Sequence, residues 1–212
     1  LGDKFRLGLF DNPYVDAQEA LEIARNDSFV EKGKQTQAFS MVLLKNNDLL
    51  PLKEGVKIYA EGMDDLSGME KYAEIVKNPS EADVIVTRIA TPWQKRKGGS
   101  LSESFFRGGR LNYSGEELSE ILDLIEQKPS VVVANLYRPT VLTEISEQCG
   151  ALMADFNTSD GVLADVLFGV RKAEGKLPFE LPSSMEAVEK QMEDVPYDSE
   201  DPLYPFGYGL SY

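Results

Sequence analysis

The sequence contains no histidine and only one cysteine among its 212 residues. Histidine is the commonest metal ligand and a frequent general base, so its absence removes both roles at once. It excludes Ser-His-Asp and Cys-His catalysis within this chain, together with histidine-bearing zinc sites. Cys149 has no second cysteine with which to form an internal disulfide or a cysteine-rich metal site. Because a glycine-rich phosphate-binding motif is also absent, we expect no metal and no cofactor.

Basic residues are scarce too, since 22 Lys and Arg against 36 Asp and Glu give a net charge of −14. Phosphate binding needs a basic surface, so we expect no nucleic-acid partner. No apolar run approaches the roughly 18–20 residues of a membrane span, and we expect no membrane partner. Residues 1–6 lack the apolar region of a signal peptide and an initiator Met. We expect this end to lie within a longer polypeptide or at a processed or engineered boundary.

From residue 56 onward, short apolar runs alternate with amphipathic segments. Residues 72–76 fit a strand or a helix equally well. Near-continuous apolar strands between helices are typical of a mostly parallel sheet that is covered on both faces. The sequence therefore predicts an α/β fold, a three-layer α/β/α sandwich preceded by a helical linker. The expected strands are 56–60, 82–89, 130–136 and 150–156, and the expected helices are 116–127, 139–145 and 160–168.

The ends of three of these helices have sequence signals. Ser114 and Glu117 form a capping box for the first, and Pro139 suits the start of the second. Gly169 suits the end of the third. These signals predict where each helix begins or ends.

The N-terminal part has a different pattern. We expect residues 1–54 to be an interdomain linker with lead-in helices, and residues 55–212 to be the sandwich domain. Asp16 would cap a helix over residues 17–25. A second helix would cover residues 31–42 and run into the apolar residues that follow. At the other end, the aromatic tail 185–212 is expected to be packed.

Ligands of parallel α/β sheets bind beyond the carboxyl ends of the strands, so we expect a site in the loops after residues 89, 136 and 156. The segment 91–113 follows the first of these positions and exceeds the roughly 12–15 residues of ordinary loops. It contains five basic residues, the only tryptophan, Trp93, and one acid, Glu103. One interpretation is a loop that covers a polar ligand, and the other is a solvated surface loop. Nearby positive charge would lower the pKa of Glu103, which suits a base better than an acid.

Other acidic residues near strand ends have structural interpretations. Glu116 and Glu117 fit the first turn of a helix, and Asp160 fits a helix cap. Asp155 and Asn157 could contact a ligand at the sheet edge, but a cap or a turn explains them equally well.

Four blocks of sequence resemble a known family. Residues 7–16, LGLFDNPYVD, are similar to the linker that follows the barrel in family-three glycoside hydrolases. Residues 40–52 resemble the entry of that family into its second domain, "VLLKN…LPL". Residues 165–179 resemble its "DVLFG…GKLPF" signature, and residues 202–212 its closing "PLYPFGYGLSY". The blocks occur in order and cover the chain from end to end.

The resemblance implies a (β/α)₈ barrel that carries a nucleophilic aspartate, followed by a smaller α/β sandwich that completes the active site. A barrel needs roughly 250 residues, so this chain would be the linker and the sandwich alone. The family's enzymes are retaining exo-β-glycosidases that act on β-glucosides, β-xylosides or related sugars. The partners implied are a β-linked saccharide and the barrel domain. Many family members are secreted or periplasmic.

By resemblance, the acid/base glutamate comes from a loop of the second domain, and Glu103 is the candidate. The surrounding sequence looks closest to a branch with "FFH-x-G-x-L", in which Arg107 here replaces the histidine. The expected sugar contacts are Trp93, Arg96, Phe106 and Arg107, which would stack on pyranose faces and donate to hydroxyl groups.

Two functions fit this resemblance. The first is the second domain of a retaining β-glycosidase, inactive without its barrel. The second is a stand-alone, non-catalytic domain of the same fold that binds carbohydrate or mediates an interaction. An unrelated doubly wound domain for a phosphorylated ligand is disfavoured because the phosphate loop is absent.

Overall fold

The computed structural model describes residues 1–94 and 108–212. The chain divides into two compact units, residues 1–36 and 37–212, and each is described by itself. The boundary predicted between residues 54 and 55 stays a prediction.

The first unit consists of short helices without a core. It contains α1 (Gly2–Arg6), α2 (Ala17–Ala24) and the start of α3 (Asp27–Ser40). The predicted cap is confirmed, because the Asp16 carboxylate accepts from the backbone N–H groups of Gln18 at 2.8 Å and Glu19 at 3.0 Å. No residue of α1 or α2 is buried.

The second unit is built on one sheet, which has six strands in the described residues. The strands lie in the order β1-β6-β5-β4-β2-β3, and all neighbours pair in parallel except β1 with β6. The ambiguous segment 72–76 contributes a strand. The strands are β1 (Val42–Asn46), β2 (Lys57–Glu61), β3 (Glu74–Val76), β4 (Val84–Ala90), β5 (Ser130–Asn135) and β6 (Ala151–Asp155).

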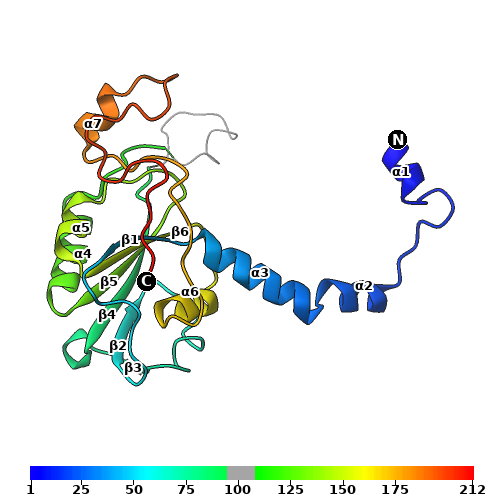
Figure 1. Ribbon diagram of the computed structural model, residues 1–212, viewed down its shortest axis with the longest axis horizontal. Coiled ribbons are helices and arrows are strands. Elements are labelled where there is room, and N and C mark those ends of the chain that lie inside the picture. The colour runs from blue at the N-terminus through cyan, green and yellow to red at the C-terminus, as the bar shows by residue number, and fades with distance from the viewer. Residues whose placement is uncertain (95–107) are drawn as a thin grey trace. The chain divides into compact units, whose positions relative to one another are not determined.

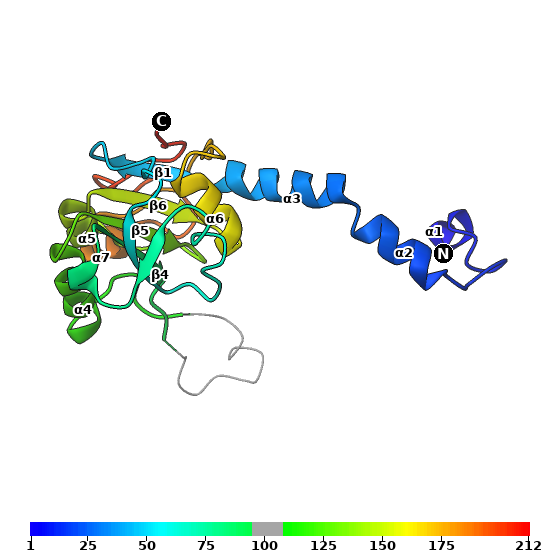
Figure 2. The same ribbon diagram turned by 90° about the horizontal axis from the view of Figure 1, so that it is seen from below.

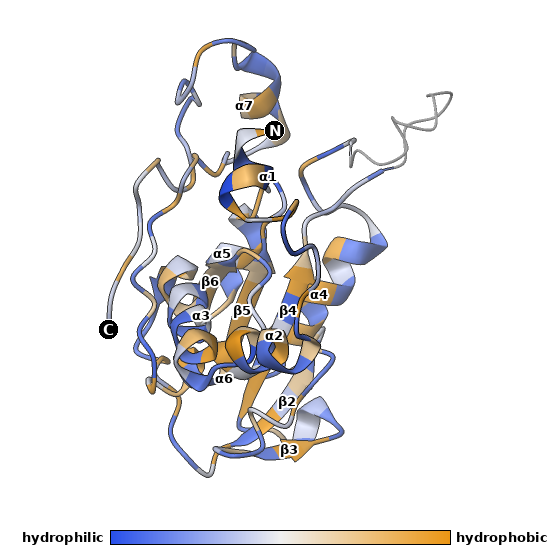
Figure 3. Ribbon diagram, turned by 90° about the vertical axis from the view of Figure 1, so that its right-hand side faces the viewer, coloured by the Kyte–Doolittle hydropathy of each residue, from blue (hydrophilic) through white to orange (hydrophobic). Residues whose placement is uncertain are grey.

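Both faces of the sheet are covered, which confirms the predicted α/β/α sandwich. On one face, Val131 and Val133 pack in a core with α6 (Asp160–Leu167). On the other, Val132 and Ala134 pack with α4 (Glu116–Glu126) and α5 (Thr143–Gln148). Figures 1 and 2 show these helices on opposite sides of the sheet. Figure 3 shows the strands mostly in the colour of hydrophobic residues, and these residues enter the cores on both faces of the sheet.

The start of the sheet differs from the prediction. The second lead-in helix ends at Ser40, and the residues expected to continue it form edge strand β1. Alternate residues of this strand enter opposite cores: Val42 and Leu44 join the core of α4 and α5, whereas Leu43 joins that of α6. A strand exposes successive side chains to opposite faces, so an unbroken apolar run with two faces to fill favours a strand.

Helix α4 begins at Glu116 as predicted, but its predicted capping box is wrong, and so is the predicted start of α5. The N-cap of α4 is Gly115, with φ +61° and no side-chain cap, so Ser114 and Glu117 form no capping box. Helix α5 begins at Thr143 and not at Pro139, because the N–H of Val141 bonds to the carbonyl of Leu111 at 2.9 Å. The end of α6 is confirmed, since Gly169 follows it at φ +73°.

The tail packs at several points, as expected. Tyr204 is buried, and the N–H of Leu210 bonds to the carbonyl of Leu43 at 2.7 Å. The Tyr212 hydroxyl donates to the carbonyl of Val166 in α6. The tail begins with the short helix α7 (Met185–Lys190), which lies beyond one end of the sheet in Figure 1. Elsewhere in the chain, the 3₁₀ turn η1 (Pro79–Glu81) joins β3 to β4. In the described residues, no helix is long and apolar enough to cross a bilayer.

Candidate functional site

The site is built where β4 ends, at the carboxyl edge of the sheet. The chain leaves β4 at Ala90 and returns to α4 at Glu116. Backbone pairing closes the two limbs of this connection on each other, since the N–H of Gln94 bonds to the carbonyl of Gly108 at 2.8 Å. We call residues 90–94 and 108–114 the neck.

Arg138, in the connection after β5, ties the two limbs of the neck together. Its Nη2 atom lies 3.0 Å from the carbonyl oxygen of Pro92 on the outgoing limb. On the returning limb it lies 3.0 Å from the carbonyl oxygen of Gly109 and 2.5 Å from that of Arg110. Burial lowers the pKa of the Arg138 guanidinium. One side chain therefore fixes the separation of the two limbs.

A second pair of hydrogen bonds fixes the neck to the sheet. The buried Tyr113 hydroxyl donates to the carbonyl of Ala90 at 2.8 Å, and Thr91 Oγ1 donates to the carbonyl of Asn135 at 3.0 Å. Burial raises the pKa of the Tyr113 phenol, with a smaller contribution from Glu117, so the phenol stays protonated and keeps donating.

Close packing inside the neck requires glycine at one position. Gly109 has φ +87°, and a Cβ there would lie 2.7 Å from Cβ of Gln94. Any other residue would be strained in its backbone and would collide with the opposite limb.

The neck surrounds a hollow of about 260 Å³. Trp93 lines it from the outgoing limb, Arg110 and Asn112 from the returning limb, and Glu117 from α4. Trp93 is half exposed, and Oδ1 of Asn112 is buried without a hydrogen-bond partner among the described residues. The hollow therefore offers an aromatic face, cationic donors and polar acceptors, a combination that suits a polyhydroxylated ligand.

One of the predicted site residues lies in the described part of the chain. The structure places Trp93 at the hollow. Arg96, Glu103, Phe106 and Arg107 lie outside the described residues, so their roles stay predictions. Arg138 was not among the predicted residues. The sequence does place this basic residue just beyond an apolar strand, which is a signal for a functional residue. The local sequence does not show that the acceptors of Arg138 are some 28 to 46 positions away.

A second arginine lies at the same edge, on the side of α6. Arg88 Nη2 is 2.5 Å from Oδ2 of Asp155, and Nη1 is 2.8 Å from Oδ1 of Asp160. Nη2 also donates to the carbonyl of Thr158 at 2.7 Å. Arg88 was not among the predicted residues, although a single base within an apolar strand is a signal for a buried ion pair.

This cluster corrects the role expected for Asp160. The N-cap of α6 is Ser159, and Asp160 instead accepts from the N–H groups of Asp64 at 3.0 Å and Asp65 at 2.9 Å. Asp155 has the turn role that was one of its two interpretations, since Oδ1 accepts from the N–H of Asn157 at 3.0 Å. Burial raises the pKa of the Asp155 carboxyl, and the Arg88 guanidinium opposes that rise. The described residues contain no group of three or more side chains that could hold a metal ion.

Comparison with known proteins identifies the family. Residues 41–212 match the model of the glycosyl hydrolase family 3 C-terminal domain. The chain is 43% identical, over its full length, to a protein named probable beta-glucosidase C from Aspergillus flavus. It is 38% identical over 99% of its length to one named periplasmic beta-glucosidase/beta-xylosidase from Dickeya chrysanthemi.

The structural comparison agrees with the sequence comparison. A beta-glucosidase from Listeria innocua, solved in complex with isofagomine, superposes with a TM-score of 0.74 at 22% identity. The superposition covers 99% of this chain and 38% of that protein. Likewise, the chain spans about a third of the length of the curated relatives it matches. The chain therefore belongs to glycosyl hydrolase family 3, of which it is a C-terminal domain.

Proposed function

We propose that this chain is the second domain of a retaining exo-β-glycosidase that hydrolyses terminal β-D-glucosides or β-D-xylosides. The nucleophile would lie on a barrel domain elsewhere in the polypeptide, and the chain alone would be inactive. The observation that carries the proposal is the neck: in a family 3 domain, Arg138 and the Gln94–Gly108 pair hold both ends of the segment that contains Glu103.

Retaining hydrolysis assigns two tasks to the carboxyl group on this side. Glu103 first protonates the departing glycosidic oxygen while the barrel carboxylate attacks the anomeric carbon and forms a glycosyl-enzyme. Glu103 then removes a proton from the water that hydrolyses this intermediate, which returns both carboxyl groups to their starting states. The two carboxyl groups must lie about 5–5.5 Å apart, so the position of the loop limbs matters for the rate.

The sugar would be held mainly by aromatic and cationic groups. Trp93 supports this role because its ring is half exposed at the hollow and is able to stack on a pyranose face. Arg96, Phe106 and Arg107 would add a second stacking surface and donors to hydroxyl groups. The names of the bacterial relatives support a secreted or periplasmic location for the whole enzyme.

Substitution of Glu103 tests the proposal in the full-length enzyme. Glu103→Gln should lower kcat/KM on alkyl β-glucosides by about 10²–10⁴-fold, the usual contribution of general acid catalysis. Activated aryl β-glucosides should lose far less in their glycosylation step, because their leaving group needs little protonation. Glu117→Gln is the matched control, since Glu117 is the carboxylate that lines the hollow.

Three results would count against the proposal. Equal losses on alkyl and aryl substrates would remove Glu103 from the acid role, and no loss on either would do the same. A leaving-group dependence seen with Glu117→Gln instead would transfer the role to Glu117.

A further inference from the structure

Helix α3 runs into the sheet through residues 37–41, which we call the junction. They form the last turn of α3 and one further residue, Met41, which precedes β1. Met41 and Ala38 are completely buried, in the core that includes α6. Oε1 of Gln37 accepts from the N–H of Ser159, at the start of α6, at 3.1 Å and from its hydroxyl group at 2.9 Å. The junction is therefore fixed to the sandwich on the side of α6.

Gly175 packs directly against the backbone of the junction. Its N–H donates to the carbonyl of Met41 at 3.0 Å. A Cβ atom on Gly175 would lie 2.6 Å from the carbonyl oxygen of Met41 and 2.7 Å from that of Ser40. With any larger residue at this position, the two carbonyl groups would have to move by roughly 0.5–1 Å to reach van der Waals distance.

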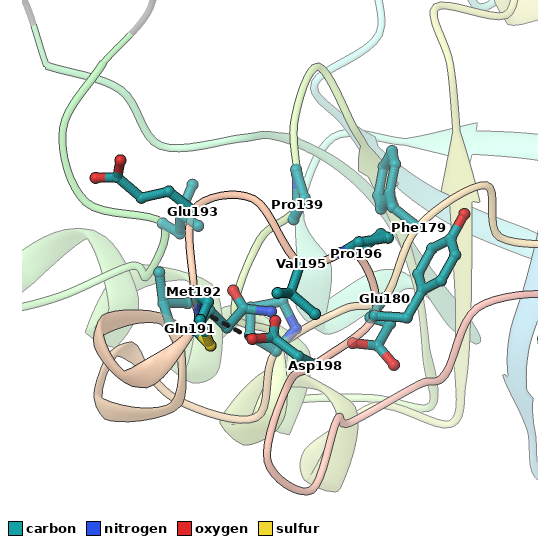
Figure 4. Close-up of a pocket in the computed structure, with 13 residues that line it drawn as sticks. Pro139, Phe179, Glu180, Gln191, Met192, Glu193, Val195, Pro196 and Asp198 are labelled. Carbon is teal, nitrogen blue, oxygen red and sulfur yellow. Dashed lines mark hydrogen bonds between the residues drawn. The ribbon is translucent and has the colours of Figure 1, made fainter.

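The segment around Gly175 has little room to recoil, because the tail lies behind it. A Cβ atom on Gly209 would lie 2.5 Å from the carbonyl oxygen of Gly175, and Nζ of Lys176 lies 2.5 Å from the carbonyl oxygen of Gly209. Residues 188–198 of the same tail differ, since they line an open groove of about 450 Å³ (Figure 4). A side chain added at Gly175 should therefore displace the junction and not the tail.

The length of α3 amplifies any displacement of the junction. The helix has 14 residues and is therefore about 21 Å long, so a tilt of its last turn moves its first turn further than the junction itself. In the proposed function, a barrel domain is joined to the sandwich through this helix, because the matched family model describes a C-terminal domain. A small change at the junction would then become a larger change in the position of the barrel.

We propose that Gly175 is a positioning residue, which sets the position of the barrel relative to the neck by holding the junction in place. The inference rests on the proposed function, in which the two catalytic carboxyl groups come from different domains and must lie about 5–5.5 Å apart. A misplacement of about 1 Å costs about 10²-fold in rate, so the displacement expected at the junction is large enough to matter.

Spin labels in the full-length enzyme test the displacement directly. Cysteines that replace Lys32 on α3 and Glu120 on α4, both exposed, carry the labels, and other exposed cysteines are replaced by serine. Gly175→Ala should change the distance between the labels, measured by pulsed electron resonance, by about 1–2 Å. Gly68→Ala is the matched control, because its Cβ would lie 2.7 Å from the backbone Cα of Gly161 in α6. It should leave the distance unchanged.

The kinetics of the same variants test the consequence. At a temperature where denaturation curves show each variant folded, Gly175→Ala should lower kcat by about tenfold or more. KM should change by less than about threefold, because the groups that hold the sugar are unaltered. A defect of folding alone would lower the activity of Gly68→Ala as well, whereas we expect that variant to keep the kcat of the wild type.

A milder variant decides the question if Gly175→Ala does not fold. Gln37→Leu removes the acceptor of Ser159 without a clash, so it should loosen the junction and lower kcat by about threefold. Gln37→Glu keeps an oxygen acceptor at this position and should retain the kcat of the wild type.

The proposal is overturned if Gly175→Ala leaves the label distance unchanged, or if the distance changes while kcat does not. It is also overturned if Gly68→Ala loses as much activity as Gly175→Ala or, where Gly175→Ala does not fold, if Gln37→Leu has the kcat of the wild type. The label distance is independent of the substitution of Glu103, so a failure of the proposed function is recognised separately.

Discussion

The two arginines at the carboxyl edge of the sheet differ in what they bind. Arg88, on β4, pairs with the carboxylates of Asp155, which ends β6, and of Asp160, which begins α6. Arg138 contacts backbone carbonyl oxygens on the two limbs of one loop. The first arrangement compensates buried charge within the core, and the second sets the shape of a chain segment next to the hollow.

Because of this difference, we expect one arginine to affect mainly stability and the other mainly activity. A buried carboxylate that loses its counter-ion is strongly destabilising, so Arg88 should matter most for folding. The carbonyl oxygens of Gly109 and Arg110 belong to exposed residues and can be hydrated when Arg138 is removed. Arg138 should therefore matter less for folding and more for activity.

The largest effect on stability is expected from Arg88→Met. It should lower the free energy of unfolding by about 3–5 kcal/mol, measured by urea denaturation of the 212-residue chain, because Asp155 stays buried without its partner. The double variant Arg88→Met/Asp155→Asn should recover at least half of this loss. A loss below about 1 kcal/mol would show that Arg88 has the weak role of a surface ion pair.

The cost of Arg88→Met should also depend on pH. Burial raises the pKa of Asp155, and among the described residues Arg88 is the opposite charge that opposes this rise. A carboxyl with a raised folded-state pKa contributes stability at low pH that is lost as pH rises through that pKa. The difference between variant and wild type should therefore be smaller at pH 4.5 than at pH 7.5. Equal differences at both pH values would contradict this account of the cluster.

A smaller loss is expected from Gly109→Ala in the neck. The change places Cβ at positive φ and against Gln94, which should together lower the free energy of unfolding by about 2–4 kcal/mol. Gly207→Ala is the matched control, because Gly207 has φ +76° with no atom within 4 Å of its Cβ position. Gly207→Ala should lower the free energy of unfolding only by the cost of a Cβ at positive φ, about 1–2 kcal/mol. If the two losses are the same, the contact between the two limbs of the neck contributes nothing to the free energy of unfolding.

The smallest effect is expected from sugar added to the isolated chain. If the saccharide site needs a barrel, millimolar glucose or cellobiose should leave the fluorescence of Trp93, the only tryptophan, unchanged. A saturable change would favour the stand-alone carbohydrate-binding function that the sequence also allowed.

The sequence predicted best what depends on local pattern. Runs such as residues 130–136 are apolar because both faces of the sheet are covered, and Asp16 caps its helix through neighbours two and three residues away. The predictions failed where a distant partner competes. Pro139 does not start a helix because Val141 pairs with Leu111, and Asp160 does not cap α6 because it binds Arg88 and the backbone of residues 64–65.

The candidate site was predictable only in its location. A long aromatic and basic segment after a parallel strand indicates the carboxyl edge of the sheet, and Trp93 does line a hollow there. The contacts of Arg138 depend on the side-by-side packing of β4 and β5, which no local pattern encodes. The catalytic role of Glu103 stays a prediction.

The most direct test of the account is the activity of Arg138→Met in the full-length enzyme. Arg88→Met is the control, and both variants are assayed at a temperature where denaturation curves show that each is folded. Loss of the neck geometry should lower kcat/KM by about 10²-fold in Arg138→Met, since a displacement of about 1 Å has that cost. Arg88→Met should stay within about threefold of the wild type, because its contacts lie within the core on the side of α6. Equal activities of the two variants would contradict the claim that Arg138 positions the loop for catalysis.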